Sequence, residues 1–199
     1  MSAERSFKIV SVTGAHSSVG KTTLCSLLLK NLKGFGAIKF TKTSLYASIV
    51  DDINKLSEKG KDTALFIGSG AERVLWIKSP RHELKDLLSI AISRMADLKG
   101  VVIEGNSPVD FLNPHLIIFI VEPDGEIKPS AVEISKKSDI IVINSKKRVR
   151  NESLTKKPSF ISPIRHKGVR VFWIDLAGGK GGINEFVRYV KERINKVTH

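Results

Sequence analysis

The chain has 199 residues, of which 41% are hydrophobic, and it carries a formal net charge of +13 at pH 7. This length supports one domain, residues 1–199, rather than two domains of ordinary size. No run reaches the roughly 18 to 20 apolar residues of a membrane-spanning helix, the first residues lack a signal-peptide core, and the single cysteine excludes an internal disulfide. We therefore expect a cytoplasmic protein whose charge favours anionic partners.

Short apolar runs alternate along the chain with segments of helical period, a pattern typical of βαβ units. The expected strands are residues 7–13, 36–40, 73–77, 101–105, 116–122, 140–144 and 169–176. The expected helices are residues 21–33, 82–96, 129–137 and 183–197. Most of the strands are continuously apolar, as strands covered on both faces are. The pattern predicts an α/β fold: a three-layer αβα sandwich with a mostly parallel sheet and helices on both faces.

The segment AHSSVGKT, residues 15–22, fits the phosphate-loop pattern of P-loop NTPases, with alanine in place of the usual first glycine. It follows a predicted strand and opens a predicted helix, where backbone N–H groups and the helix dipole bind phosphate. Lys21 would contact the β- and γ-phosphates, and the Thr22 hydroxyl would coordinate Mg²⁺. The predicted nucleotide contacts here are Ala15, His16, Ser17, Ser18, Val19, Gly20, Lys21, Thr22 and Thr23.

Two side chains in and after this loop have simpler interpretations. The side chain of His16 is more consistent with a solvated position than with a γ-phosphate contact. Cys25, one turn into the helix, is expected to be a small core residue.

The phosphate loop needs an acidic partner, and Glu104 follows three apolar strand residues and precedes a glycine. A carboxylate there can order Mg²⁺ or position the attacking water, so Glu104 is predicted as a metal and catalytic residue together with Lys21. Asp62 is the other catalytic candidate. Because it precedes an expected helix, it is either a helix N-cap or a metal or switch residue. Asp51 and Asp52 are further acidic candidates.

The base-binding end is ambiguous in the sequence. Guanine is commonly read by N-K-x-D after a late strand, and here Asn144 is followed by Ser145 and Lys147 in place of the Lys and the Asp. Further along, IDLAGGKGGINEF resembles the base-contacting element of G-domains. Its glycines have the alternative role of turning the chain into the last helix. The candidates in this element are Ala177, Gly178, Gly179 and Lys180.

Residues at about 145–168 are basic, contain Ser and Pro, and show no clear period, which predicts an extended loop. Such a loop could hold nucleic acid or an acidic partner. Its one aromatic residue is Phe160, whereas single-strand binding sites stack bases on several aromatic rings, so a solvated surface is favoured.

Four segments resemble, in order and spacing, the molybdopterin-guanine dinucleotide biosynthesis protein B family, MobB: VSVTGAHSSVGKTTL, AIKFTKT, GKDTALFIGSGAERVLWI and VVIEGNSP. The resemblance covers residues 7–122. It implies a GTP-binding protein of the signal-recognition-like class of P-loop NTPases, often dimeric, that assists a partner enzyme in attaching a nucleotide to molybdopterin. It also implies that Lys39 and Thr41 line the nucleotide pocket and that Asp62 and Glu104 are the acids.

The chain departs from that family at Lys42 and Thr43, which replace paired histidines. From Ser135 onward it looks more like metallochaperone GTPases or other relatives of this class. The P-loop thus predicts Mg²⁺-dependent binding and hydrolysis of a nucleotide. The resemblance implies that GTP is favoured over ATP and that the protein assists molybdenum-cofactor assembly. One alternative is an ATP-dependent synthetase related to dethiobiotin synthetase, with a carboxylate substrate anchored by Lys39, Lys42 and Arg73. The others are a GTPase metallochaperone and a nucleic-acid-binding module.

Overall fold

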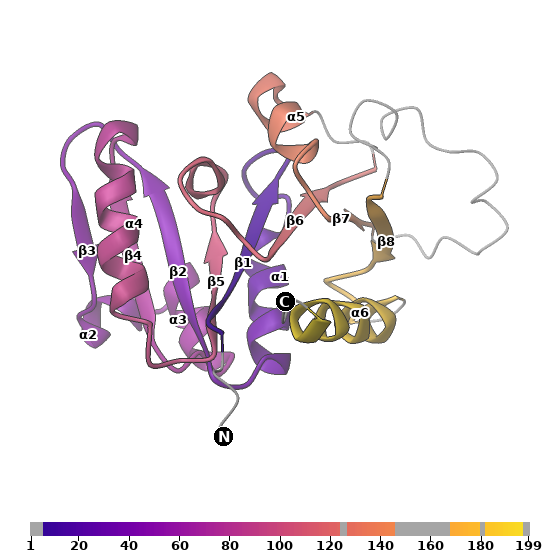
Figure 1. Ribbon diagram of the computed structural model, residues 1–199, viewed down its shortest axis with the longest axis horizontal. Coiled ribbons are helices and arrows are strands. Elements are labelled where there is room, and N and C mark those ends of the chain that lie inside the picture. The colour runs from indigo at the N-terminus through magenta and orange to yellow at the C-terminus, as the bar shows by residue number, and fades with distance from the viewer. Residues whose placement is uncertain (1–5, 124–126, 146–167, 180–181, 197–199) are drawn as a thin grey trace, which may run out of the picture.

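The computed structural model describes residues 6–123, 127–145, 168–179 and 182–196. In this part of the chain, eight strands form one sheet in the order β3-β4-β2-β5-β1-β6-β7-β8, and only β3 runs antiparallel to its neighbour (Figure 1). The strands are β1 (Lys8–Gly14), β2 (Phe35–Lys42), β3 (Ser48–Val50), β4 (Val74–Ser79), β5 (Gly100–Glu104), β6 (Leu116–Val121), β7 (Ile140–Asn144) and β8 (Arg170–Ile174).

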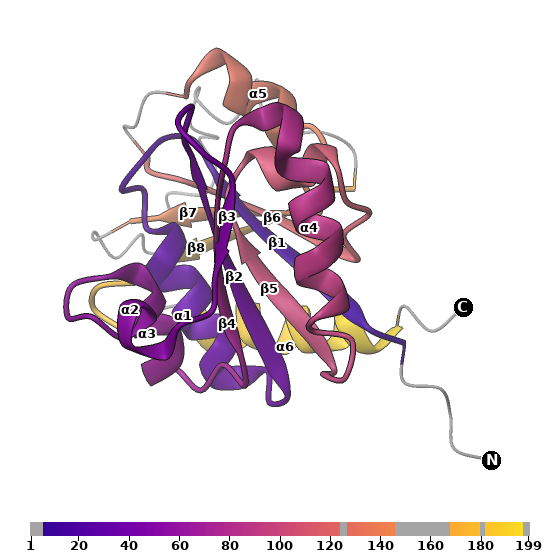
Figure 2. The same ribbon diagram turned by 90° about the vertical axis from the view of Figure 1, so that its left-hand side faces the viewer.

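Helices cover both faces of this sheet (Figure 2). One face packs against α1 (Lys21–Asn31), α2 (Ile53–Leu56), α3 (Asp62–Gly68) and α6 (Ile183–Lys196) in a shared apolar core. The other face is covered by α4 (Leu84–Ser93) and α5 (Pro129–Ser135). Two short 3-10 helices are η1 (Arg81–Glu83) and η2 (Ser107–Asp110). The αβα sandwich expected from the sequence is confirmed.

The strand register places a row of functional side chains. Glu104 at the end of β5 is in register with Val12 of β1 on one side and with Lys39 of β2 on the other, and Lys39 is in register with Trp76 of β4. Side chains in register on neighbouring parallel strands point to the same face. Val12 belongs to the core beneath α1, so Glu104, Lys39 and Trp76 lie in one row on the α1 face.

Two of the three elements between β2 and β4, namely β3 and α2, were not expected from the sequence, because they are too short to show a clear period. The third, α3, is the helix that was expected next to Asp62, and it begins at that residue. Asp52 caps α2 by accepting the N–H of Asn54 at 3.0 Å, and Asp51 pairs with Arg94 at 3.1 Å. These two aspartates therefore have structural partners. The predicted basic loop at about 145–168 lies almost wholly outside the described residues.

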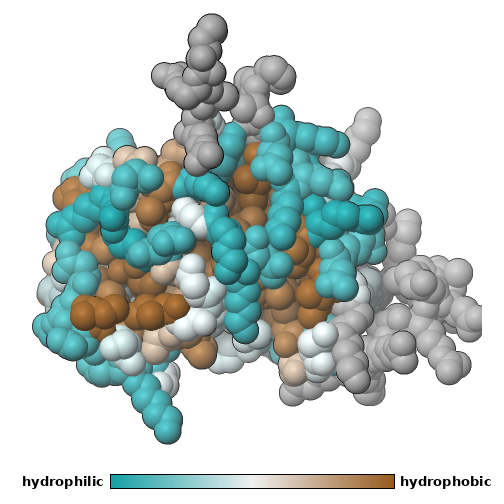
Figure 3. All heavy atoms as spheres, turned by 90° about the horizontal axis from the view of Figure 1, so that it is seen from below, coloured by the Kyte–Doolittle hydropathy of each residue, from teal (hydrophilic) through white to brown (hydrophobic). Residues whose placement is uncertain are grey.

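The surface mixes apolar and hydrophilic side chains, as the view from below shows (Figure 3). The large exposed apolar residues do not share one helix face. Leu45 and Tyr46 lie in the loop between β2 and β3, and the others lie on three different helices: Ile53, Leu65 and Ile90. Across the described ranges, no helix combines the length and the apolar character that crossing a bilayer requires.

Candidate functional site

The loop between β1 and α1 contains two left-handed residues. Gly20, the N-cap of α1, has φ 106°, and a Cβ there would lie 2.9 Å from Nδ2 of Asn144, so the position requires glycine. Ser18, with φ 62°, is the one non-glycine residue of positive φ in the described part of the chain. Left-handed residues of this kind form concave nests of backbone N–H groups that bind anions, and the start of α1 adds its dipole.

Ala15 explains why this loop tolerates alanine at its first position. The residue does not have a positive φ. Its N–H donates to the carbonyl of Ile120 in β6 at 3.0 Å, and its side chain is fully buried. The chain therefore still follows the sheet at this point, and the conformational freedom of glycine is not needed.

The other predicted loop residues differ in exposure. Ser17, Ser18 and Thr23 are exposed, whereas Val19 is buried in the core. The Nε2 atom of His16 lies 3.7 Å from Glu122, so this side chain faces an acid next to the loop. The expected core position of Cys25 is confirmed: it is 1% exposed, and burial raises the pKa of its thiol well above the ordinary value.

Asn106, in the turn after β5, fixes the start of the loop. Its side chain accepts the N–H of Gly14 at 2.9 Å and donates to the carbonyl of Gly14 at 2.9 Å. The sequence interpretation missed this residue. Its position directly after Glu104 and Gly105 was the available signal, because an amide there reaches the end of the neighbouring strand β1.

Replacing Asn106 with alanine should lower the free energy of unfolding by about 1–3 kcal/mol, because both Gly14 backbone groups lose their partner at a partly buried position. Denaturant unfolding measures this change. Asn184→Ala, on the exposed surface of α6, is the control and should change stability by less than about 0.5 kcal/mol. Equal stability of the two variants would show that the Asn106 contacts are dispensable.

The charged centre of the site joins α1, β2, β5 and α3. The Thr22 hydroxyl donates to Oε2 of Glu104 at 3.0 Å. The Lys39 ammonium lies 2.5 Å from Oε1 of Glu104 and 2.6 Å from Oδ2 of Asp62. Burial lowers the pKa of Lys21, whose Nζ donates to the carbonyl of His16 at 2.6 Å across the loop. The structure thus brings together the four residues that were predicted to carry the chemistry, which are Lys21, Thr22, Asp62 and Glu104. Lys39 lies between the two acids.

The pKa of Lys39 reflects this position. Burial alone would lower it, but the charge of Glu104 and hydrogen bonds to Asp62 and Glu104 raise it above its ordinary value. Lys39 is therefore held in its charged form between the two carboxylates.

Thr22 and Glu104 provide the hard oxygen ligands that suit Mg²⁺. Magnesium binds through one or two protein oxygens together with substrate phosphates and water. Within the described residues, no group of three or more His, Cys, Asp or Glu side chains could hold a metal ion. The donor set next to the loop fits a magnesium ion that also contacts the phosphates.

The sequence left two roles open for Asp62, a helix N-cap and a metal or switch residue, and the structure contradicts the first. It is the first residue of α3 and not its cap, since the N-cap is Lys61 and makes no side-chain cap hydrogen bond. Its carboxylate pairs with Lys39 and lines a cavity of 220 Å³. The cavity is formed by Lys39, Thr41, Gly60, Lys61, Asp62, Thr63 and Trp76.

The far end of the site is organised by Asn144, at the end of β7. Its Nδ2 donates to the carbonyl of Val19 at 3.1 Å, and its Oδ1 accepts the N–H of Leu176 at 3.4 Å. This amide ties the loop after β1 to the turn after β8. Lys147 and Lys180, which also entered the sequence interpretation, lie outside the described residues.

In that turn, Oδ1 of Asp175 accepts the N–H groups of Ala177 at 3.1 Å and of Gly178 at 2.7 Å. Asp175 was missed by the sequence interpretation. Because Ala177 is one of the candidate base-contacting residues, a base contact through its N–H would have to displace this hydrogen bond.

No protein-family model and no curated protein matches this sequence. Solved structures are similar in fold. HypB from Helicobacter pylori in complex with nickel has a TM-score of 0.60 at 13% identity, covering 98% of this chain and 92% of that chain. PAB0955, a GTPase from Pyrococcus abyssi in apo form, has a TM-score of 0.52 at 15% identity, covering 96% and 98%. Hydrogenase maturation factor HypB from Archaeoglobus fulgidus has 0.51 at 19% identity, covering 94% and 90%.

This chain has the P-loop NTPase fold. Its P-loop is residues 15–22, and the acid of its central strand is Glu104, at the end of β5. Sequence identities this low show shared architecture and do not transfer a ligand or a partner from those proteins.

One of the three anchors considered for the synthetase alternative does not lie near the P-loop. Arg73 lies just before β4, at the amino end of that parallel strand, and pairs with Asp97 at 2.8 Å. The P-loop lies at the carboxyl ends of the parallel strands, so the expectation that Arg73 anchors a carboxylate substrate there was wrong. Lys42, in contrast, ends β2 and is exposed.

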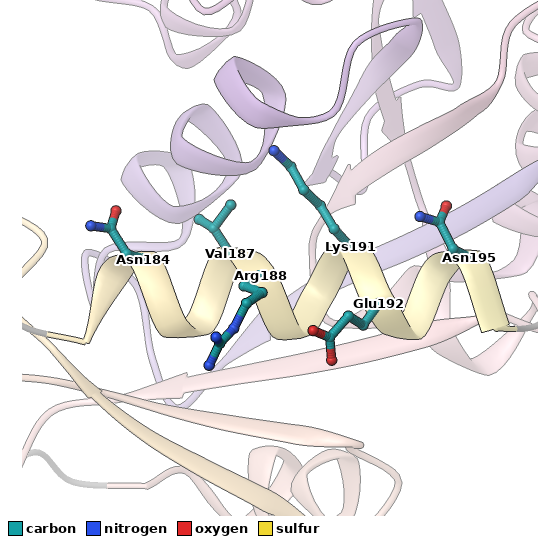
Figure 4. Close-up of a pocket in the computed structure, with 6 residues that line it drawn as sticks. All are labelled: Asn184, Val187, Arg188, Lys191, Glu192 and Asn195. Atoms are coloured by element: carbon teal, nitrogen blue, oxygen red, sulfur yellow. The ribbon is translucent and has the colours of Figure 1, made fainter.

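A second cavity, of 380 Å³, lies along α6 (Figure 4). All its lining residues belong to that helix, and none belongs to the P-loop or the acidic pair: Asn184, Val187, Arg188, Lys191, Glu192 and Asn195. It is therefore separate from the candidate nucleotide site.

Proposed function

We propose that this protein binds and hydrolyses a nucleotide with Mg²⁺, favours GTP over ATP, and assists an enzyme of molybdenum-cofactor assembly. The proposed nucleotide site is supported most directly by the hydrogen bond from the Thr22 hydroxyl to Oε2 of Glu104, at 3.0 Å. This contact lies beside the left-handed turn at Gly20. A hydroxyl and a buried carboxylate in contact next to an anion-binding loop form the pair that a magnesium-bound triphosphate requires.

Each residue then has a role that follows from its place. Lys21 binds the β- and γ-phosphates once its ammonium leaves the His16 carbonyl. Thr22 and Glu104 hold the magnesium ion, which when bound neutralises charge on the phosphates. Asp62, beyond Lys39, lies on α3 and is exposed enough to move as a switch residue, since its side chain is 43% exposed.

The preference for GTP is supported by Asn144, which occupies the first position of the guanine motif and is fixed by Val19 and Leu176. The preference is opposed by Ser145, which replaces the motif's lysine. The molybdenum-cofactor role and a possible homodimer rest on the MobB-like order of segments over residues 7–122.

A GTPase metallochaperone is a second candidate, supported by the similarity in fold to two HypB structures, one of them in complex with nickel. The synthetase is less well supported, because Arg73 is engaged with Asp97 away from the P-loop.

Thermal unfolding with GTP, ATP and their Mg²⁺ complexes tests the proposed base preference. A ligand that binds only the folded state stabilises it by RT ln(1 + [L]/Kd), which is about 2.7 kcal/mol at a hundredfold excess over Kd. We expect a larger shift with Mg·GTP than with Mg·ATP at equal concentration. A larger shift with ATP would contradict GTP selectivity and favour the synthetase. Stoichiometric Ni²⁺ binding without nucleotide would favour the metallochaperone.

A further inference from the structure

Lys39 pairs with two carboxylates at once in a mostly buried cluster. Its side chain is 16% exposed, and that of Glu104 is 3% exposed. The oxygens of Glu104 are engaged by different donors, because Oε2 accepts from Thr22 and Oε1 contacts Lys39. A buried carboxylate left without a positive partner is strongly unfavourable, so the nucleotide-free site depends on this ammonium.

We infer that Lys39 is a positioning residue that takes the place of a divalent cation between Glu104 and Asp62 until a magnesium-bound nucleotide enters. This inference rests on the proposed nucleotide site. In the free protein, a divalent ion must compete with the ammonium for Oε1 of Glu104 and for Asp62. Phosphates supply further oxygen ligands and negative charge, which shift that competition toward the metal.

The structure also provides space for Lys39 to leave Glu104. The 220 Å³ cavity is lined by Lys39 itself and by Asp62, Thr41 and Trp76. Asp62, which is 43% exposed, can keep its contact with the ammonium while Glu104 is released. Lys39 therefore exchanges one carboxylate partner and retains the other, and its charge is never left unpaired.

The test measures the binding of Mn²⁺, a paramagnetic substitute for Mg²⁺, to the nucleotide-free protein. Binding is detected as a decrease in the electron paramagnetic resonance signal of free Mn²⁺. The wild-type chain should bind Mn²⁺ weakly. Lys39→Met should bind Mn²⁺ at least roughly tenfold more tightly. The variant lacks the ammonium 2.5 Å from Oε1 of Glu104, whose positive charge repels the metal ion. Lys39→Met combined with Glu104→Gln should lose this gain.

Two variants separate the effect of charge at this position from charge in general. Lys39→Arg keeps the cation and should bind Mn²⁺ as weakly as the wild type. Lys78→Met removes a lysine that stacks on Trp76, 3.7 Å from the ring centroid, and should also leave Mn²⁺ binding unchanged. If Lys39→Met does not fold, Lys39→Gln provides the same measurement.

Unchanged Mn²⁺ affinity in folded Lys39→Met, or tight Mn²⁺ binding by the nucleotide-free wild type, would overturn the inference. Titration with a fluorescent GTP analogue is run in parallel. A wild-type chain that binds no nucleotide would remove the proposed function, whereas the Mn²⁺ comparison would still decide the role of Lys39.

Discussion

Lys21→Ala is expected to weaken nucleotide binding by roughly 100-fold or more, because the variant loses charge-assisted hydrogen bonds to two phosphates. The fold should persist. Within the described residues, the ammonium of Lys21 donates one hydrogen bond, to the carbonyl of His16. Burial lowers the pKa of Lys21, so the charge of this side chain does not stabilise the folded protein. Isothermal titration with Mg·GTP, together with a thermal melt of the free protein, measures both effects.

Lys30→Ala is the matched control, since Lys30 is exposed near the end of the same helix, α1. It removes one positive charge from the chain without touching the P-loop and should leave affinity within about twofold of the wild type. Equal losses in the two variants would mean that general charge, and not the P-loop, holds the nucleotide.

Glu104→Gln is expected to lower the rate of Mg²⁺-dependent hydrolysis by roughly 100-fold or more, because the buried carboxylate that contacts Thr22 loses its charge. Binding of nucleotide without Mg²⁺ should be retained, since the P-loop and Lys21 are unchanged. The comparison therefore requires the Kd in Mg²⁺, the Kd in a chelator, and single-turnover rates. The advantage that Mg²⁺ gives to binding should disappear in the variant.

Glu122→Gln provides the control for Glu104→Gln. Glu122 is also close to the P-loop, with Oε2 3.7 Å from His16, but it is outside the cluster of Thr22, Lys39 and Asp62. Hydrolysis by this variant should match the wild type. If Glu104→Gln keeps the wild-type rate and Mg²⁺ requirement, the metal-site acid must be reassigned, and Asp62 is the nearest alternative.

Local signals in the sequence were sufficient to select many residues of the candidate site. The sequence predicts the P-loop because its residue types follow one another within eight positions, and it places Glu104 because three apolar strand residues precede it. Contacts that depend on register were not predictable in the same way. The pairing of Lys39 with Glu104 requires β2 to lie next to β5, and nothing local to either strand specifies that neighbour.

Side-chain contacts with the backbone were also missed. Asn106 binds Gly14, and Asp175 binds the N–H groups of Ala177 and Gly178. Amide and carboxylate side chains of this kind occur in many turns, so their residue type alone does not show which backbone group they meet. Two short elements between β2 and β4, the strand β3 and the helix α2, were missed for a different reason, since segments of three or four residues carry too little periodicity.

The Asn144 amide would couple the two ends of the proposed nucleotide site. It joins the carbonyl of Val19, in the P-loop, to the N–H of Leu176, in the turn proposed to lie next to the base. A base that shifted this turn would therefore also shift the P-loop. We expect discrimination between bases to be expressed as a change in phosphate affinity, so that substitutions of Asn144 alter both properties together.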